Sequence, residues 1–234
     1  MAEAHKILAT IKTALEAGGQ PDGHNHAAAP APARKVAVTA GAERAELATS
    51  LARELEAVGG KFVGILSPDE VSNRIVLLAR EIGATTVAIG EGVSIDMEEI
   101  GAALERADFK IVKTVPVADV ERAAMRDRVA NAELGIAEAE YGIASTGTLA
   151  VISTGTRPSS LTLLPTASLI IVQIDRVMAD LAAVLASLGP TRLAEHRMTL
   201  ITGPSRTADI EKRIVLGVHG PKALHLIVVW PRDE

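Results

Sequence analysis

Residues 62–89 read F-V-G-I-L-S-P-D-E-V-S-N-R-I-V-L-L-A-R-E-I-G-A-T-T-V-A-I. The short apolar run at 62–66 predicts a β-strand. Ser67 followed by Pro68 and two acidic residues is typical of a helix start, with Pro68 in the first helical position. A second apolar run at 86–89 predicts another strand. A strand, a helix and a strand in this order predict a parallel β-α-β unit.

The same alternation continues on both sides of this unit. Strands are predicted at 36–39, 110–115, 136–145, 149–152, 169–174 and 224–230, and helices at 43–58, 97–106, 117–129 and 175–188. Strands that are apolar on both faces and separated by helices favour a mostly parallel sheet covered on both sides. The sequence therefore predicts a three-layer α/β/α domain over residues 34–234.

The N-terminal part of the chain has a different composition. Apolar residues recur at helical spacing within residues 1–17, which predicts an amphipathic helix. Residues 18–33 are rich in Gly, Pro, Ala and His, as is typical of a flexible linker. We expect the helix to dock on a partner or on the main body.

Composition excludes several classes of function. The formal net charge is −5 and aromatic residues make up 2% of the chain, so single-strand nucleic-acid binding is disfavoured. The chain has no cysteine, which excludes disulfides and thiolate-bound metal clusters. No signal-peptide core or membrane span is predicted, and we expect a cytoplasmic protein without its own metal or cofactor. The Gly90-Glu91-Gly92 turn lacks the third glycine of a dinucleotide fingerprint, because Ile95 stands in its place.

A second stretch, residues 198–211, reads M-T-L-I-T-G-P-S-R-T-A-D-I-E. An apolar run leads into the Gly203-Pro204 turn, and Ser205, Arg206 and Thr207 precede a helix-like start. A strand that feeds a turn and a helix N-terminus is a common anion site. An ordinary connection with Thr207 as the helix N-cap is equally consistent with these residues.

The tetrapeptide Ser-Thr-Gly-Thr occurs twice, at residues 145–148 and 153–156, on either side of one predicted strand. Four polar loops follow or precede strands: the first tetrapeptide, the Arg157 loop, the 203–207 turn and the 218–221 turn. Ligands in open α/β sheets gather at strand ends. Arginines and hydroxyls together suit a small carboxylate or phosphate. The predicted pocket has Thr146, Gly147, Thr148 and Arg157 on one wall and Gly203, Ser205, Arg206, Thr207 and Asp209 on the other.

Three side chains are candidates for acid–base or nucleophilic chemistry. Glu138 and Glu140 would lie about 7 Å apart on one side of a single strand. Either carboxylate could act as a general base or nucleophile, and an acidic, solvent-facing edge is at least as consistent with them. His219 could act as an acid–base group, although a histidine in such a turn more often serves only as a hydrogen-bonding residue.

Three ordered segments carry a family resemblance. They are G-I-A-E-A-E-Y-G-I-A-S-T-G-T-L at 135–149, I-T-G-P-S-R-T-A-D-I-E at 201–211 and G-V-H-G-P at 217–221. Together they resemble the LUD domain family, which includes the lactate utilization protein C (YkgG-like) proteins. Glu140 stands where the family usually keeps an acid, whereas Ser145 stands where it often has one.

The resemblance implies a fold similar to the sugar-isomerase and CoA-transferase-like superfamily. It also implies a role in oxidising L-lactate to pyruvate with two partner proteins that carry iron–sulfur clusters. The leading hypothesis is an accessory, non-redox subunit of such a system that binds a small anion. The alternatives are a stand-alone isomerase or CoA-transferase-like enzyme that uses Glu140, and a pure protein-interaction module.

Overall fold

The computed structural model describes residues 41–114, 119–195, 197–208, 214–216 and 220–230. The chain divides into two units, residues 1–34 and 35–234, and every described residue belongs to the second. The predicted N-terminal helix, the linker and the strand at 36–39 lie outside the described residues. Within the described part, no helix is long and apolar enough to cross a membrane.

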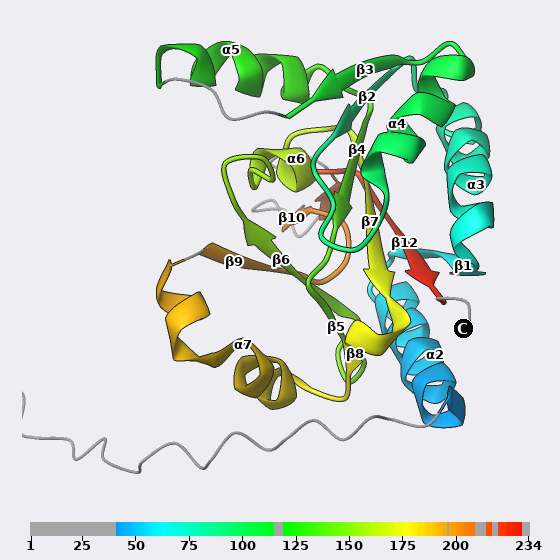
Figure 1. The fold of residues 1–234 in the computed structure, drawn as a ribbon, viewed down its shortest axis with the longest axis vertical. Coiled ribbons are helices and arrows are strands. Elements are labelled where there is room, and N and C mark those ends of the chain that lie inside the picture. Colours follow the sequence, from blue (N-terminus) through cyan, green and yellow to red (C-terminus); the bar gives the residue numbers. More distant parts are fainter. Residues whose placement is uncertain (1–40, 115–118, 196, 209–213, 217–219, 231–234) are drawn as a thin grey trace, which may run out of the picture. The chain divides into compact units, whose positions relative to one another are not determined.

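The centre of this unit is a six-stranded sheet (Figure 1). Its strands are β1 (Lys61–Leu66), β2 (Thr86–Ile89), β3 (Lys110–Lys113), β4 (Leu134–Glu138), β7 (Ala167–Gln173) and β12 (Ala223–Val229). Their order is β1-β12-β7-β4-β2-β3, and every neighbouring pair is parallel. All carboxyl ends therefore lie at one edge of the sheet and all amino ends at the opposite edge.

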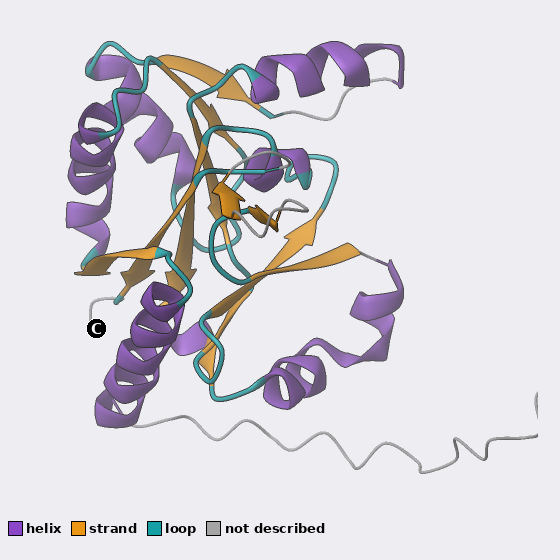
Figure 2. Ribbon diagram, turned by 180° about the vertical axis from the view of Figure 1, so that it is seen from behind, coloured by secondary structure: helices purple, strands orange, loops and turns teal. Residues whose placement is uncertain are grey.

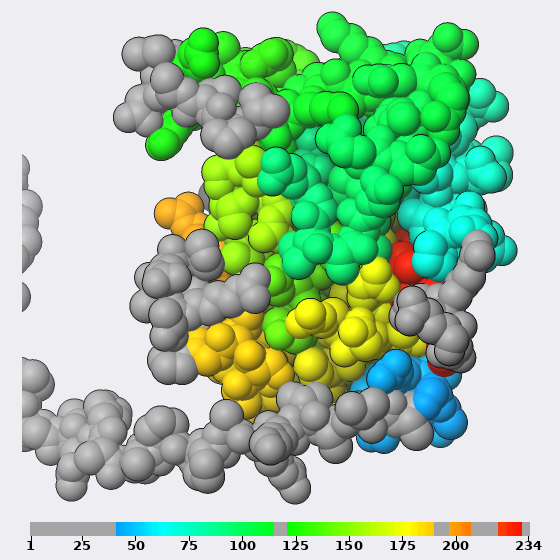
Figure 3. Space-filling view, viewed as in Figure 1, coloured from blue at the N-terminus to red at the C-terminus, as the bar shows by residue number. Residues whose placement is uncertain are grey.

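Helices cover both faces of the sheet, as predicted. Helices α3 (Pro68–Glu81) and α4 (Met97–Arg106) pack on one face, while α2 (Gly41–Ala57), α5 (Asp119–Ala130) and α6 (Ser160–Leu163) pack on the other (Figure 1). Side chains of β12 alternate between the two layers: Ile227 joins the α3–α4 core, and Leu226 and Val228 join the α2 core. Only small parts of β12 reach the surface in the space-filling view (Figure 3).

Local sequence explains the β1-α3-β2 unit. The Ser67 backbone N–H donates to the Glu70 carboxylate over 2.9 Å, and Pro68 occupies the first turn. A reciprocal capping box of this kind satisfies N–H groups that have no partner inside the helix. The predicted strand, helix start and second strand are confirmed at these residues.

A second, four-stranded sheet packs beside the first (Figure 2). It contains β5 (Tyr141–Ile143), β6 (Thr148–Ser153), β8 (Val177–Met178) and β9 (Arg197–Ile201) in the order β8-β5-β6-β9, and α7 (Leu181–Glu195) covers it. The prediction of one strand over 136–145 is wrong, because β4 ends at Glu138 and β5 begins at Tyr141 in a different sheet. The apolar pattern continues across the break, since both flanking segments are buried.

Two predicted helices differ from the structure. The helix expected from Asp175 is replaced by a 3-10 turn, Ile174–Arg176, and by β8, and α7 begins only at Leu181. The helix start expected after Ser205 is also wrong at its first residues. Arg206–Ala208 forms β10, which pairs antiparallel with β11 (Ile214–Leu216). Antiparallel pairing with the next strand in the chain overrides the local N-cap pattern there.

Candidate functional site

Glu138 ends β4 at the carboxyl edge and is 3% exposed. Its carboxylate accepts backbone N–H bonds from Val93 at 2.6 Å and from Ser94 and Ile95 at 3.1 Å, and it also accepts the Ser94 hydroxyl. Three successive amides around one carboxylate form a nest, a common anion-binding arrangement. Glu138 therefore holds the loop between β2 and α4 in place.

Glu140 points to a different partner. Its carboxylate lies 3.3 Å from Nη1 of Arg157, and the two side chains are 4% and 13% exposed. Because the chain leaves one sheet after Glu138 and enters another, the two acids do not share a strand face. The structure therefore brings together predicted site residues Glu140 and Arg157 and gives Glu138 a separate role.

The second Ser-Thr-Gly-Thr tetrapeptide leads into Arg157. The hydroxyls of Thr154 and Thr156 lie 3.2 Å apart, and Thr154 Oγ1 accepts the Arg157 backbone N–H over 3.2 Å. The Thr156 carbonyl accepts the hydroxyl of Thr114, the residue after β3, over 2.7 Å. This turn therefore lies at the carboxyl edge of the large sheet, beside Arg157.

The first tetrapeptide packs against α2. Gly147 has a φ of +64°, and a Cβ at this position would overlap the backbone of Glu54 and Leu55. Thr146 and Thr148 hydroxyls lie 2.8 Å apart, and Thr148 Oγ1 lies 2.7 Å from Thr202 Oγ1. This chain of hydroxyls connects the turn to the end of β9.

The two tetrapeptides lie at opposite ends of β6. β6 runs from Thr148, the last residue of the first tetrapeptide, to Ser153, the first residue of the second, and its five steps of about 3.3 Å separate these residues by roughly 17 Å. The predicted single pocket is therefore divided: Thr146, Gly147 and Thr148 lie on the Thr202 side, and Arg157 lies with Glu140.

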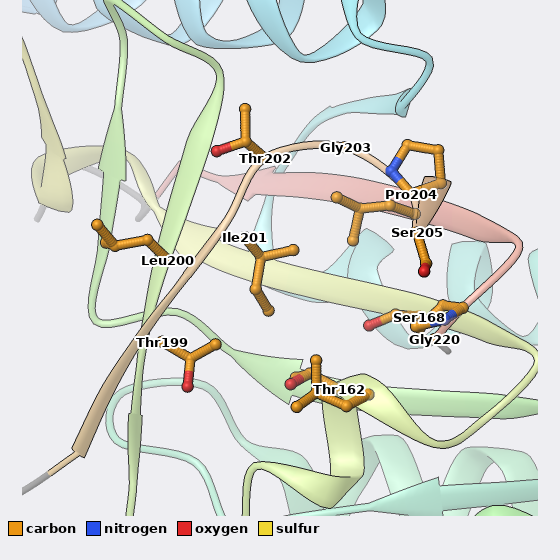
Figure 4. Close-up of a pocket in the computed structure, with 13 residues that line it drawn as sticks. Thr162, Ser168, Thr199, Leu200, Ile201, Thr202, Gly203, Pro204, Ser205 and Gly220 are labelled. Carbon is orange, nitrogen blue, oxygen red and sulfur yellow. The ribbon is translucent and has the colours of Figure 1, made fainter. Parts of the chain in front are cut away.

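A cavity of about 210 Å³ lies at the amino ends of β7 and β12, where β9 crosses them (Figure 4). Predicted residues Gly203 and Ser205 line it. The other lining residues are Thr162, Leu163, Ser168, Thr199, Leu200, Ile201, Thr202, Pro204, Gly220, Pro221 and Leu224. Within the described part of this lining, no side chain is charged. Sequence reasoning missed Ser168 and Thr202, since a lone hydroxyl in or beside an apolar strand gives no signal.

Arg206 does not line this cavity. Its Nη2 donates to the Val58 carbonyl, just after the last residue of α2, where helix carbonyls lack intrahelical partners. A cation at a helix C-terminus also complements the helix dipole. Thr207 lies in β10, and Asp209 and His219 lie outside the described residues.

His225, which is 3% exposed in β12, belongs to the core. Burial, together with the nearby Lys61 and Arg74 charges, lowers the pKa of His225 to about 4. A neutral imidazole facing α3 is a structural group, because it lies away from the Arg157 cluster and outside the lining of the 210 Å³ cavity.

A second cavity of about 170 Å³ lies at the carboxyl ends of β7 and β12. Its lining includes Ser94, Asp96, Glu99 and Gln173. The two carboxylates make it a poor site for an anion, because like charges repel. Arg157 is therefore the better candidate for anion binding at this edge of the sheet.

Comparison with known proteins gives a consistent assignment. Residues 48–229 match the LUD domain family. The uncharacterized protein YkgG of Escherichia coli K12 is 31% identical over 169 residues, which cover 70% of this chain and 71% of that protein. Lactate utilization protein C of Halalkalibacterium halodurans is 33% identical over 110 residues, 45% of this chain and 48% of that protein. The chain thus spans about half the length of that relative.

A solved structure supports the fold. The crystal structure of a DUF162 family protein from Deinococcus radiodurans superimposes with a TM-score of 0.55 and 19% identity, covering 80% of this chain and 98% of that one. The family match covers most of the chain, and it includes both tetrapeptides, Arg157 and the 203–207 turn. The chain therefore belongs to the LUD domain family.

Proposed function

We propose that this chain is a non-redox subunit of a system that oxidises L-lactate to pyruvate, and that it binds a small carboxylate at Arg157. The lactate role follows from its similarity to proteins named lactate utilization protein C. Iron–sulfur clusters would belong to partner proteins, because this chain has no cysteine to hold them.

The position of Arg157 is the main support for a carboxylate ligand. Its guanidinium is mostly buried beside Glu140 and follows a turn with two hydroxyls. A guanidinium has five N–H donors in a planar fork that matches a carboxylate. Glu140 contacts Nη1 of Arg157 and so orients the guanidinium. A substrate carboxylate would bind through the other N–H groups of this guanidinium. Ligand sites in open α/β sheets also favour this edge.

Isothermal titration of the purified chain with L-lactate, pyruvate, acetate and inorganic phosphate would test this proposal. Arg157→Ala should weaken carboxylate binding by at least about tenfold, since a charge-assisted pair contributes about 1.5–3 kcal/mol. Arg176→Ala is the matched control, because Arg176 contacts the Tyr141 hydroxyl and ring rather than a carboxylate. Equal binding by wild type and Arg157→Ala would contradict the proposed ligand site.

The role in lactate oxidation needs its own measurement. A strain that lacks this chain should fail to grow on L-lactate and should recover with the wild-type chain. Affinity purification of the chain from lactate-grown cells should recover cysteine-rich, iron-containing partners. Normal growth of the deleted strain would contradict the assignment even if carboxylate binding holds.

The buried position of Glu140 also favours a second candidate, a stand-alone isomerase or CoA-transferase-like enzyme. A 5% exposed carboxylate next to an arginine could act as a nucleophile or base. Incubation with acyl-CoA followed by mass spectrometry would show an adduct on Glu140 if the chain used it as a nucleophile. No adduct, and no turnover of acyl-CoA or sugar phosphates, would argue against this candidate.

A further inference from the structure

The cavity at the amino ends of β7 and β12 contains a buried hydroxyl that bonds to none of the described residues. Ser168 lines this cavity and is 1% exposed, and its Oγ has no hydrogen-bond partner in the described part of the chain. Figure 4 shows the hydroxyl on the cavity side of β7, directed to the space between Ile201 and Thr162. A buried polar group without a partner costs about 1–3 kcal/mol. A ligand that accepts its hydrogen bond would therefore recover free energy that the empty cavity loses.

Two of the four other hydroxyl side chains that line the cavity bond to protein atoms, and the other two are those of Thr199 and Ser205. Thr162 Oγ1 donates to the Ser159 carbonyl, and Thr202 Oγ1 bonds with Thr148. Their bonds fix the shape of the wall, and among the described lining residues the Ser168 hydroxyl is the one that is both buried and without a partner. On the adjacent wall, Gly220 lies so close to Ser205 that a Cβ there would be 2.9 Å from the serine Cβ.

The rest of the cavity is suited to an uncharged, apolar body. Leu163 and Leu200 at its sides are 39% and 42% exposed, which is high for leucine. Ile201, Leu224 and two prolines line the interior. None of the described lining residues is charged, and burial of an ionised group among such side chains without a charged partner costs several kcal/mol. The volume of about 210 Å³ is also below the ~300–1,000 Å³ typical of drug-sized ligands.

From these observations we propose that this cavity is a second ligand site, specific for a small uncharged carbonyl compound with an apolar body. The carbonyl oxygen accepts the Ser168 hydroxyl, and the apolar part packs against Ile201, Leu200 and Leu163. This site is separate from Arg157, which lies beyond the far end of β6. The inference therefore does not depend on the proposed carboxylate site.

Cyclohexanone is a suitable probe, with cyclohexanecarboxylate as its charged counterpart. Titration of the ¹⁵N-labelled chain should shift the amide signals of Ile201, Thr202 and Ser168 with cyclohexanone. Cyclohexanecarboxylate should bind there at least tenfold more weakly. Ser168→Ala removes one oxygen atom and should fold, and it should weaken cyclohexanone binding about fivefold, as expected for one neutral hydrogen bond.

Ser187→Ala is the matched control. Ser187 also has a buried hydroxyl that bonds to none of the residues the structure describes, but it lies in α7 and does not line this cavity. Ser187→Ala and Arg157→Ala should both bind cyclohexanone like the wild type. The proposal is overturned if cyclohexanone shifts none of the cavity signals, if Ser168→Ala binds it as tightly as wild type, or if the charged compound binds more tightly.

Discussion

The two Ser-Thr-Gly-Thr turns have the same sequence and the same pairing of their threonine hydroxyls, yet their surroundings differ. In the first turn Gly147 is buried against α2, and Thr148 extends the hydroxyl pair to Thr202. In the second, Gly155 is exposed, and no described atom lies within 4 Å of where its Cβ would be. The glycine of the first copy is thus part of the packing against α2, whereas the glycine of the second copy is not packed against any described residue. A repeated motif therefore does not imply a repeated role.

The largest expected difference between the turns is at their glycines. Gly147→Ala should lower the free energy of unfolding by about 3 kcal/mol, from the positive φ and the overlap with α2. Gly155→Ala should change it by less than about 0.5 kcal/mol, as for most exposed loop sites. Urea denaturation with linear extrapolation measures both values. Similar losses for the two variants would mean that the turns are equivalent.

A smaller difference is expected at the second threonine of each turn. Thr148→Val removes a buried hydroxyl with two partners and should cost about 1.5 kcal/mol, as judged from the same denaturation experiment. Thr156→Val removes a less buried hydroxyl with one 3.2 Å contact and should cost about 0.5 kcal/mol. The backbone carbonyl of residue 156 still accepts from Thr114 in that variant. If Thr156→Val lowered the free energy of unfolding more than Thr148→Val, the second turn would be the one that stabilises the fold.

The smallest expected effect concerns Arg206, which the sequence predicted as a ligand contact together with Arg157. Arg206→Ala removes the bond to the Val58 carbonyl at the end of α2 and should cost about 1 kcal/mol of stability. Its affinity for L-lactate or phosphate, measured by titration, should equal that of the wild type. Loss of anion binding without loss of stability would restore Arg206 as a ligand contact and weaken the distinction between the two regions.

Local signals in the sequence were sufficient to predict the β1-α3-β2 unit and most of the large sheet. Pro68 and the capping residues around Ser67 act within a few residues of each other, so their effect is visible without the fold. The second sheet was not predicted, because the break between Glu138 and Tyr141 falls inside a continuous buried run. The strand at Arg206–Ala208 depends on pairing with residues 214–216, which a local pattern does not contain.

The candidate site shows the same limit. The sequence identified Arg157, Glu140 and both turns as polar groups near strand ends, and the structure brings Glu140 and Arg157 together. The sequence also predicted a strand between the two turns, yet it placed the first turn and Arg157 on one wall of a single pocket, whereas they lie at opposite ends of β6. The cavity beside the buried Ser168 hydroxyl is lined by three separate parts of the chain, within 162–168, 199–205 and 220–224. A local sequence pattern therefore could not predict it.

The Glu138 nest also has a consequence for how the domain folds. Its donors at 93–95 precede the carboxylate by 43–45 residues, so the loop cannot close until β4 has paired with β2. Pairing of parallel strands over such a separation is slow, because the entropy of closing the intervening chain is lost before the contacts form. The loop that precedes α4 is therefore fixed by a residue synthesised well after it, whereas the first turn of α4 is capped locally, because the Asp96 side chain accepts the Glu99 backbone N–H.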